Sequence, residues 1–186
     1  MIKRSELKII WEDNNLNNAR NFIISNSAIN LFPSRRINSI YFDNIYNQMY
    51  HESIEGIVPR KKIRIRNYGK FFSNINLLEK KYTYENHREK ESKKIKFDEK
   101  VLKIHKDKIY GNCFRKIIVS FEREYFIINN SRITIDYNIK AFNIENMDLY
   151  MPLPEIIIEF KSFFFKENLN LIDKLGFQTS RFSKYT

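Results

Sequence analysis

The sequence predicts an α+β fold built mainly from antiparallel β-strands, with a few helices packed against them, including one near the C-terminus. Segments rich in Ile, Phe, Tyr and Val recur along the chain, and most of them alternate charged with apolar side chains. Only 4 Gly and 4 Pro punctuate the 186 residues, and no Ser-, Pro- or Gly-rich stretch indicates a linker. We therefore expect a single domain over residues 1–186.

Strand-like segments lie near residues 4–10, 37–43, 59–68, 75–83, 92–97, 115–128, 131–139 and 155–161. Apolar residues spaced three and four apart predict helices over 15–26 and 166–175, and Gly176 marks the end of the second. A third helix is expected over 98–109. Many strands with few helices favour an antiparallel sheet or barrel.

The charge balance favours a polyanionic partner. Lys and Arg number 33 against 22 Asp and Glu, a formal net charge of +11. Asn, Ile and Lys are abundant together, as codon drift in an AT-rich genome would produce, so the placement of charges matters more than their sum. The single cysteine, Cys113, excludes an intrachain disulfide and a multi-cysteine metal site. No apolar run predicts a signal peptide or a membrane span, so we expect a cytoplasmic chain without membrane insertion.

Charged residues occupy alternate positions on strand after strand. The stretch RKKIRIRNYG, residues 60–69, carries Arg60, Lys62, Arg64 and Arg66. Charged pairs two residues apart recur as Glu6 with Lys8, Glu79 with Lys81, Lys94 with Lys96, and Glu159 with Lys161. The solvated outer face of a sandwich would give such alternation on any single strand. A barrel with its charges inward and its apolar face covered by helices explains all of these strands at once.

A row of inward Arg and Lys side chains would repel itself unless an anion neutralised it. Phosphate chains suit this role, because guanidinium groups bind phosphate oxygens in pairs and lysines supply compact charges. The three histidines, His51, His87 and His105, lack metal-site spacing and are expected on the surface or in loops.

Eight motifs in order carry a resemblance to a known family: INSIYFDNIYNQMYHESIEG, KIRIRNYG, LLEKKY, SKKIKF, FEREYF, SRITID, IIIEFKS and RFSKYT. Together they resemble the VTC domain, the catalytic domain of polyphosphate polymerases of the vacuolar transporter chaperone, within the triphosphate tunnel metalloenzyme (CYTH-like) superfamily. The resemblance implies a tunnel-shaped antiparallel barrel of about eight strands. It implies phosphate-binding residues at Lys8, Arg64, Arg66, Lys81, Arg123, Arg132, Lys161 and Lys184, with Lys94 and Lys96 as weaker additions.

The same resemblance implies a divalent metal, Mn²⁺ or Mg²⁺, on Glu159, with Glu6 or Glu79 as further ligands. The implied reaction transfers the γ-phosphate of ATP onto a growing inorganic polyphosphate chain. The alternatives are hydrolysis of tripolyphosphate or nucleoside triphosphates, and a polyphosphate-binding module without catalysis.

Nucleic-acid binding would also explain the positive charge, but acids on the same strand faces suit a simple polyanion-binding surface poorly. Delivery of a product across a membrane would need a membrane-protein partner. The sequence indicates no oligomeric state.

Overall fold

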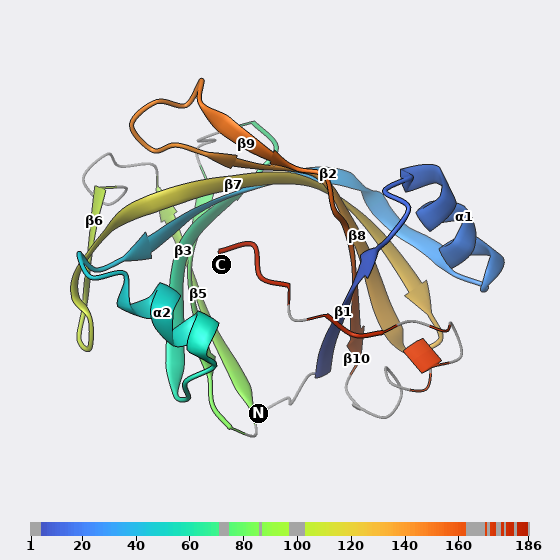
Figure 1. Ribbon diagram of the computed structural model, residues 1–186, viewed down its shortest axis with the longest axis horizontal. Coiled ribbons are helices and arrows are strands. Elements are labelled where there is room, and N and C mark those ends of the chain that lie inside the picture. The colour runs from blue at the N-terminus through green and yellow to red at the C-terminus, as the bar shows by residue number, and fades with distance from the viewer. Residues whose placement is uncertain are drawn as a thin grey trace. The chain divides into compact units, whose positions relative to one another are not determined.

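Ten β-strands of one mostly antiparallel sheet make up most of the described chain (Figure 1). The computed structural model describes residues 5–70, 75–85, 87–96, 103–162, 170, 172–173, 176, 178–180 and 182–185. The strands are β1 Ser5–Trp11, β2 Ile29–Asp43, β3 Arg60–Tyr68, β4 Ile75–Thr83, β5 Arg88–Lys96, β6 Ile104–Asp107, β7 Gly111–Ile128, β8 Ser131–Phe142, β9 Tyr150–Leu153 and β10 Ile156–Ser162. The described helices are α1, Leu16–Ser25, and α2, Gln48–Glu55.

The predicted fold class is confirmed, and the strand count is larger than predicted. Eight strands follow the order β1-β10-β8-β7-β2-β3-β4-β5, and each overlaps one predicted segment, although β2 and β5 begin earlier than the predicted 37–43 and 92–97. The two additional strands, β6 and β9, have four residues each and pair with β7 and β8. The path ends at β1 and β5, and among the described strands no pairing joins these two ends. β5 is exposed along most of its length and rich in Lys, a composition typical of an edge strand that avoids further pairing.

The chain divides into two compact units. Unit 1 comprises Met1–Arg35, Phe121–Ile139 and Pro152–Ser183, and unit 2 comprises Arg36–Ser120, Lys140–Met151 and Lys184–Thr186. Strands β2, β7 and β8 each contribute residues to both units. The expectation of a single domain stays a prediction.

Helix α1 covers the apolar core of unit 1. It begins after Asn15, whose side-chain oxygen accepts hydrogen bonds from the backbone N–H groups of Asn17 and Asn18. Its buried residues, Ala19 and Ile23, join a core built from β1, β7, β8 and β10. Figure 1 shows the helix lying alongside the start of β2. The helix therefore closes one face of the unit 1 sheet against solvent.

Strand register in unit 1 separates an apolar face from a charged one. Ile9 lies opposite Ile158, which lies opposite Ile135, and all three belong to the core. One residue along, Lys8 lies opposite Glu159, which lies opposite Thr134. Because successive side chains of a strand point to opposite faces, the charged residues lie on the face away from the core.

Helix α2 of unit 2 lies beside β3 (Figure 1). The first N–H groups of this helix donate hydrogen bonds to a side chain that lies several positions before the helix in the sequence. Asn47 precedes the helix in a left-handed conformation, with φ of 53°, and its side chain caps nothing. The carboxylate of Asp43, at the end of β2, instead accepts hydrogen bonds from the N–H groups of Met49 and Tyr50. This helix was not predicted, because its cap depends on where β2 ends.

Two predicted helices have different outcomes. Residues 104–107 of the helix expected over 98–109 form strand β6, so the prediction is wrong there; residues 98–102 lie outside the described part. β6 pairs with the start of β7, and this ladder outweighs the local helical pattern. The helix expected over 166–175 lies mostly outside the described residues. Within the described ranges, no helix combines the length and the apolar content needed to cross a membrane.

Neighbouring isoleucines of α1 provide a matched test of the unit 1 core. Ile23 is fully buried, whereas Ile24 keeps 54% of its surface exposed. Ile23→Ala should lower the free energy of unfolding by about 3 kcal/mol, because it leaves a cavity in the core. Ile24→Ala should change it by less than about 0.5 kcal/mol. Urea denaturation measures both, and equal effects would contradict the placement of α1.

Candidate functional site

The charged face of unit 1 centres on a buried arginine. Arg123 of β7 holds Asp136 of β8 through two hydrogen bonds, from Nε to Oδ1 and from Nη2 to Oδ2, the latter at 2.6 Å. Its Nη2 atom also lies 3.3 Å from Oε2 of Glu159 on β10. Burial alone would lower the pKa of Arg123, but the carboxylates of Asp136 and Glu159 raise it. The guanidinium therefore remains charged although its side chain is only 10% exposed.

Acidic and basic groups alternate around Glu159. Lys161 Nζ lies 3.0 Å from Glu159 Oε2 and 3.9 Å from Glu6 Oε2, so one ammonium bridges two carboxylates. Lys8 Nζ lies 3.6 Å from Glu6 Oε1 and donates a hydrogen bond to the carbonyl of Phe182. Burial would raise the pKa of Glu159, but the positive charges of Lys161 and Arg123 hold it well below its usual range. The carboxylate of Glu159 is thus ionised and paired with both Lys161 and Arg123.

We call this group the Arg123 cluster; it consists of Glu6, Lys8, Arg123, Asp136, Glu159 and Lys161. It contains three carboxylates and three basic groups, so it is formally neutral. A neutral group of this kind has little excess charge with which to attract an anion. Its distinctive chemistry is the pair of carboxylates, Glu6 and Glu159, that share an ammonium.

One face of strands β3, β4 and β5 in unit 2 is strongly basic. Register places nine basic side chains of β3, β4 and β5 on one face: Arg60, Lys62, Arg64, Arg66, Lys81, Arg88, Lys90, Lys94 and Lys96. Among the described residues of these three strands, Glu79 is the single carboxylate on that face. The row of positive charge expected from RKKIRIRNYG is therefore present and extends over three strands. We call it the basic face.

Glu79 gathers three of these basic groups around itself. Arg64 Nε and Nη2 both lie 2.7 Å from Glu79 Oε2, Arg66 Nε lies 3.9 Å from the same oxygen, and Lys90 forms an ion pair with Oε1. Burial would raise the pKa of Glu79, but Arg64, Arg66 and Lys90 lower it to about 2. The carboxylate of Glu79 therefore pairs with three basic groups, but its single negative charge does not neutralise the basic face.

Tyr41 of β2 joins this group from the neighbouring strand. It lies opposite Arg64 in the β2–β3 register, and Arg64 Nη1 donates a hydrogen bond to its hydroxyl over 3.3 Å. Burial would raise the pKa of Tyr41, but the positive charges of Arg64, Arg66 and Lys184 lower it to about 8. The Tyr41 hydroxyl therefore lies among positive charges, which favour the ionised form of the phenol. Tyr41, Arg64, Arg66, Glu79 and Lys90 are called the Arg64 cluster below.

The structure distributes the predicted residues between these two groups. Lys8, Arg123, Lys161, Glu6 and Glu159 lie in the Arg123 cluster, and Arg64, Arg66 and Glu79 in the Arg64 cluster. Lys81 lies on the basic face opposite Lys62 and Lys90, and Lys94 and Lys96 are exposed on it. Arg132 is exposed and lies opposite Lys161 in register. Lys184 acts electrostatically on Tyr41.

Three functional candidates lie beyond the predicted set. Tyr41 precedes Asp43 in the motif YFD, and only its pairing with Arg64 reveals its role. Asp136 lies in the motif SRITID, but its bond to Arg123 depends on the β7–β8 hairpin. Lys90 lies in the charged run HREKESKK, which as sequence is typical of a solvated hairpin.

The donor set of the Arg123 cluster fits a divalent cation better than the Arg64 cluster does. Glu6 and Glu159 already converge on one cation, the Lys161 ammonium, whereas the Glu79 carboxylate is surrounded by three basic groups. No group of three or more His, Cys, Asp or Glu side chains among the described residues has the geometry of a metal site. Two carboxylates suffice for Mg²⁺, which commonly completes its octahedron with waters and phosphate oxygens.

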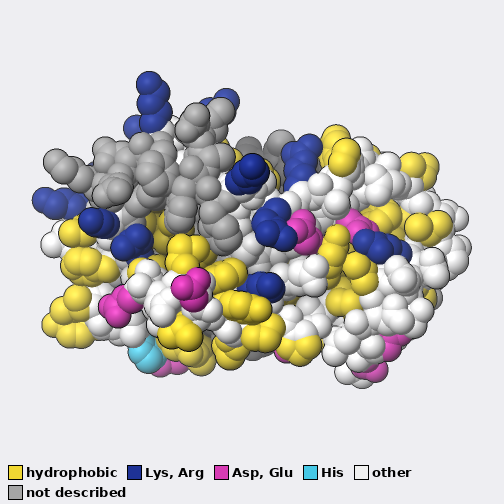
Figure 2. Space-filling view, turned by 90° about the horizontal axis from the view of Figure 1, so that it is seen from above, with side chains coloured by type: hydrophobic (Ala, Val, Ile, Leu, Met, Phe, Trp, Pro, Cys, Tyr) yellow, Lys and Arg dark blue, Asp and Glu magenta, His cyan; other side chains and the backbone are white. Residues whose placement is uncertain are grey.

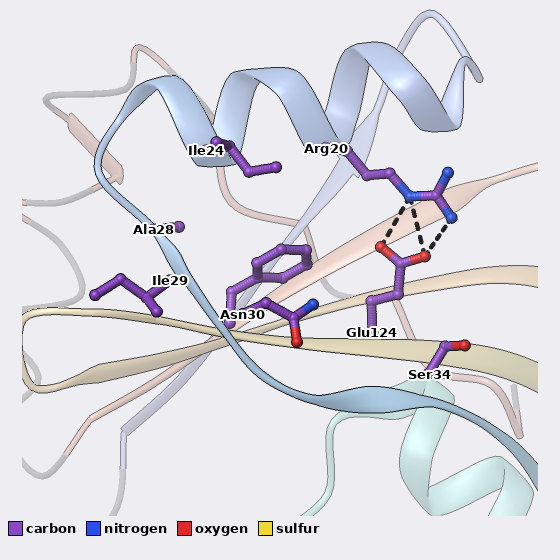
Figure 3. A pocket seen from close by; sticks show the side chains of 8 residues that line it. Arg20, Ile24, Ala28, Ile29, Asn30, Ser34 and Glu124 are labelled. Atoms are coloured by element: carbon purple, nitrogen blue, oxygen red, sulfur yellow. Dashed lines mark hydrogen bonds and ion pairs between the residues drawn. The ribbon is translucent and has the colours of Figure 1, made fainter.

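A cavity of about 620 Å³ in unit 1 has no residue of the Arg123 cluster in its lining (Figure 3). Its lining includes Ala28 and Phe126 of the apolar core, on the side that α1 covers. The two charged residues that line it, Arg20 and Glu124, form an ion pair with each other, drawn as dashed lines in Figure 3. The cavity therefore offers no unpaired charge to a phosphate ligand.

The surface seen in Figure 2 carries Lys and Arg side chains over much of its width. At several places these basic side chains lie next to acidic ones, and hydrophobic side chains lie between them.

Comparison with known proteins supports the family resemblance seen in the sequence. The family model of the VTC domain matches residues 3–113. No curated protein shows significant sequence similarity to the chain.

Solved structures share its fold at low identity. A candidate adenylate cyclase from Vibrio parahaemolyticus superposes with a TM-score of 0.61 at 12% identity, covering 97% of this chain and 94% of that one. A protein from Pyrococcus horikoshii OT3 gives 0.58 at 16% identity, with coverage of 97% and 94%. A candidate adenylyl cyclase from Hippeastrum, described as having a dominant triphosphatase activity, gives 0.55 at 13% identity, with coverage of 98% and 93%.

Replacing Glu79 tests the electrostatics of the Arg64 cluster. At neutral pH, Glu79→Gln should lower the free energy of unfolding by about 3 kcal/mol, because it leaves buried basic groups without their carboxylate. The pKa of Glu79 falls on folding from its ordinary 4.5 to about 2, so its contribution is complete above pH 4.5 and is lost as the pH falls toward 2. The difference between wild type and variant should therefore shrink over that interval in urea denaturation.

The exposed Glu145, replaced by Gln, serves as the control for loss of a carboxylate. A Glu79→Gln variant as stable as the wild type at pH 7, or a deficit that does not change between pH 4.5 and 2, would refute the assigned contacts.

Proposed function

Because the chain belongs to the VTC domain family, we propose that it is a metal-dependent phosphotransferase that extends inorganic polyphosphate with the γ-phosphate of ATP. The observation that carries this proposal is the basic face, on which nine basic side chains stand against the single carboxylate of Glu79 among the described residues of its strands. A linear phosphate chain carries about one negative charge per phosphate and is narrow enough to lie along neighbouring strands spaced about 4.8 Å apart. A bound phosphate chain would neutralise the positive charge of the basic face that Glu79 does not balance.

Arg64 and Arg66 are the residues best placed to bind phosphate oxygens. Their planar guanidinium groups are held by Glu79, Tyr41 and Ser39, so they would lose little side-chain freedom when a ligand arrives. Lysines of the same face, such as Lys62, Lys81 and Lys90, add charge along the bound chain. Preorganised positive charge of this kind stabilises the charge that develops on the transferred phosphoryl group.

The transfer needs no nucleophile from the protein. A terminal oxygen of the polyphosphate chain forms the new bond to the γ-phosphorus of ATP, the bond from that phosphorus to the bridging oxygen breaks, and ADP leaves with the electron pair. The buried thiol is poorly suited to take part, because burial and nearby carboxylates raise the pKa of Cys113 to about 11. The residues of the chain therefore act by binding, aligning and neutralising the reactants.

Glu159 and Glu6 are the residues that would hold Mn²⁺ or Mg²⁺. When bound, such an ion would act as a Lewis acid and withdraw electron density from phosphorus. The depressed pKa of Glu159 keeps its carboxylate ionised at neutral pH. Lys161, which now lies between the two carboxylates, is close enough to contact phosphate oxygens brought to this position.

Hydrolysis of a triphosphate is the second candidate function. The Hippeastrum protein with the same fold is described as having a dominant triphosphatase activity. The same basic face would hold the substrate, and water would take the place of the polyphosphate terminus as the attacking group. The two reactions differ in their products, so a product assay separates them.

The test is incubation of the purified chain with ATP and Mn²⁺, with products resolved by gel electrophoresis and phosphorus NMR. Long-chain polyphosphate and ADP are the expected products. Orthophosphate without growth of polyphosphate would show that the protein is a triphosphatase. Binding of tripolyphosphate without any turnover would show that it is a binding module without catalysis. Glu159→Gln should lower the turnover rate by a factor of at least roughly 100, which is the effect of losing one transition-state contact. Binding of tripolyphosphate should persist in this variant. Glu145→Gln is the control, and equal activity of both variants would refute the role of Glu159.

A further inference from the structure

Tyr185 docks the segment that carries Lys184 into unit 2. Its ring stacks on that of Tyr41, with centroids 4.9 Å apart and planes 19° apart. It meets the Tyr50 ring edge to face at 6.1 Å, and Lys62 Nζ lies 5.8 Å from its centroid. The side chain is buried, with 8% of its surface exposed. Aromatic stacking and burial of this extent favour one position for the segment.

The hydroxyl of Tyr185 contacts the carboxylate of Asp43, which also accepts backbone hydrogen bonds at the end of β2. It donates a hydrogen bond of 2.6 Å to Asp43 Oδ2. The same oxygen accepts from the N–H of Tyr50, and Oδ1 accepts from the N–H groups of Asn44 and Met49. Asp43 is fully buried, so loss of the tyrosine hydroxyl would leave part of its charge without a donor. The docking site is thus built into the start of α2.

Docking of Tyr185 determines where Lys184 lies. Lys184 precedes Tyr185 directly, and Tyr185 stacks on the tyrosine whose hydroxyl accepts a hydrogen bond from Arg64. The ammonium of Lys184 is one of the charges that lower the pKa of Tyr41. A residue far along the chain thereby adds its charge to the Arg64 cluster.

We propose that Tyr185 is a positioning residue of the phosphate site, because its docking against Tyr41 and Asp43 sets Lys184 beside the Arg64 cluster. This inference rests on the proposed function, since it assigns Lys184 to the binding of a phosphate chain. Tyr185 itself contacts no phosphate and acts through Lys184. The segment therefore adds Lys184 to the site from outside strands β3, β4 and β5.

The docking is tested first without any phosphate. Tyr185→Ala should increase the rate at which an amine-reactive reagent labels Lys184 several-fold, as measured by mass spectrometry of the digested protein. Tyr46→Ala, at a tyrosine that is 76% exposed, is the matched control and should leave the rate unchanged. Tyr185→Phe keeps the ring and loses only the hydroxyl, so its labelling rate should fall between those of the wild type and Tyr185→Ala. An unchanged rate in Tyr185→Ala would overturn the docking role.

Calorimetric titration with tripolyphosphate then tests the role in binding. Lys184→Met should weaken binding roughly tenfold, the size of one charge-assisted contact. Tyr185→Ala should weaken it by a similar factor, and the double variant should be no weaker than Lys184→Met, because both changes remove the same contact. Tyr185→Phe should recover most of the affinity, and it replaces Tyr185→Ala in these comparisons if circular dichroism shows that the alanine variant fails to fold.

The outcomes separate this inference from the proposed function. A wild-type chain that binds no tripolyphosphate would overturn the proposed function and the role of Lys184 with it, while the labelling result would still decide whether Tyr185 docks the segment. Normal wild-type binding that Tyr185→Ala leaves intact would overturn the inference alone. A further loss of binding on adding Tyr185→Ala to Lys184→Met would show that Tyr185 acts through the fold and not through Lys184.

Discussion

Repulsion between like charges on one face of a sheet is the constraint on which this structure depends. A strand presents alternate residues to opposite faces, so β3 cannot bury Ile63 and Ile65 without directing Arg64 and Arg66 to the other side. The apolar face contributes hydrophobic burial, whereas the basic face costs electrostatic free energy. Glu79, with a pKa lowered to about 2, offsets part of that cost in unit 2. An anionic ligand would offset the rest.

The Arg123 cluster and the basic face differ in how far their positive charges are neutralised, which is consistent with different functions. In the Arg123 cluster, carboxylates match the basic groups in number, and Arg123 is buried between Asp136 and Glu159. On the basic face, a large excess of positive charge remains. The proposed function assigns metal binding to the first group and phosphate binding to the second. The balance of charge within each unit therefore says more about function than the net charge of +11.

Much of the fold followed from sequence because its physical cause is local. Segments rich in Ile, Phe, Tyr and Val predicted the eight strands of the main path, and period-two alternation placed Glu159 and Lys161 on the same face. Helix α1 was predicted from the spacing of its apolar residues. Helix α2 was missed, because its cap comes from Asp43, and the strand β6 replaced part of an expected helix because it pairs with β7. Partners that depend on register, such as Lys90 for Glu79 and Tyr41 for Arg64, are not encoded in any short motif.

The central claim is that the basic face is a phosphate-binding surface, and calorimetric titration of Arg64→Met with tripolyphosphate at physiological salt tests it most directly. Lys93→Met is the matched control, because Lys93 is exposed on the opposite face of β5. The account predicts saturable binding to the wild type and to Lys93→Met, and binding weakened at least tenfold in Arg64→Met, roughly the effect of losing a bidentate charge-assisted contact. Equal affinity of all three proteins, or no saturable binding to the wild type, would contradict it.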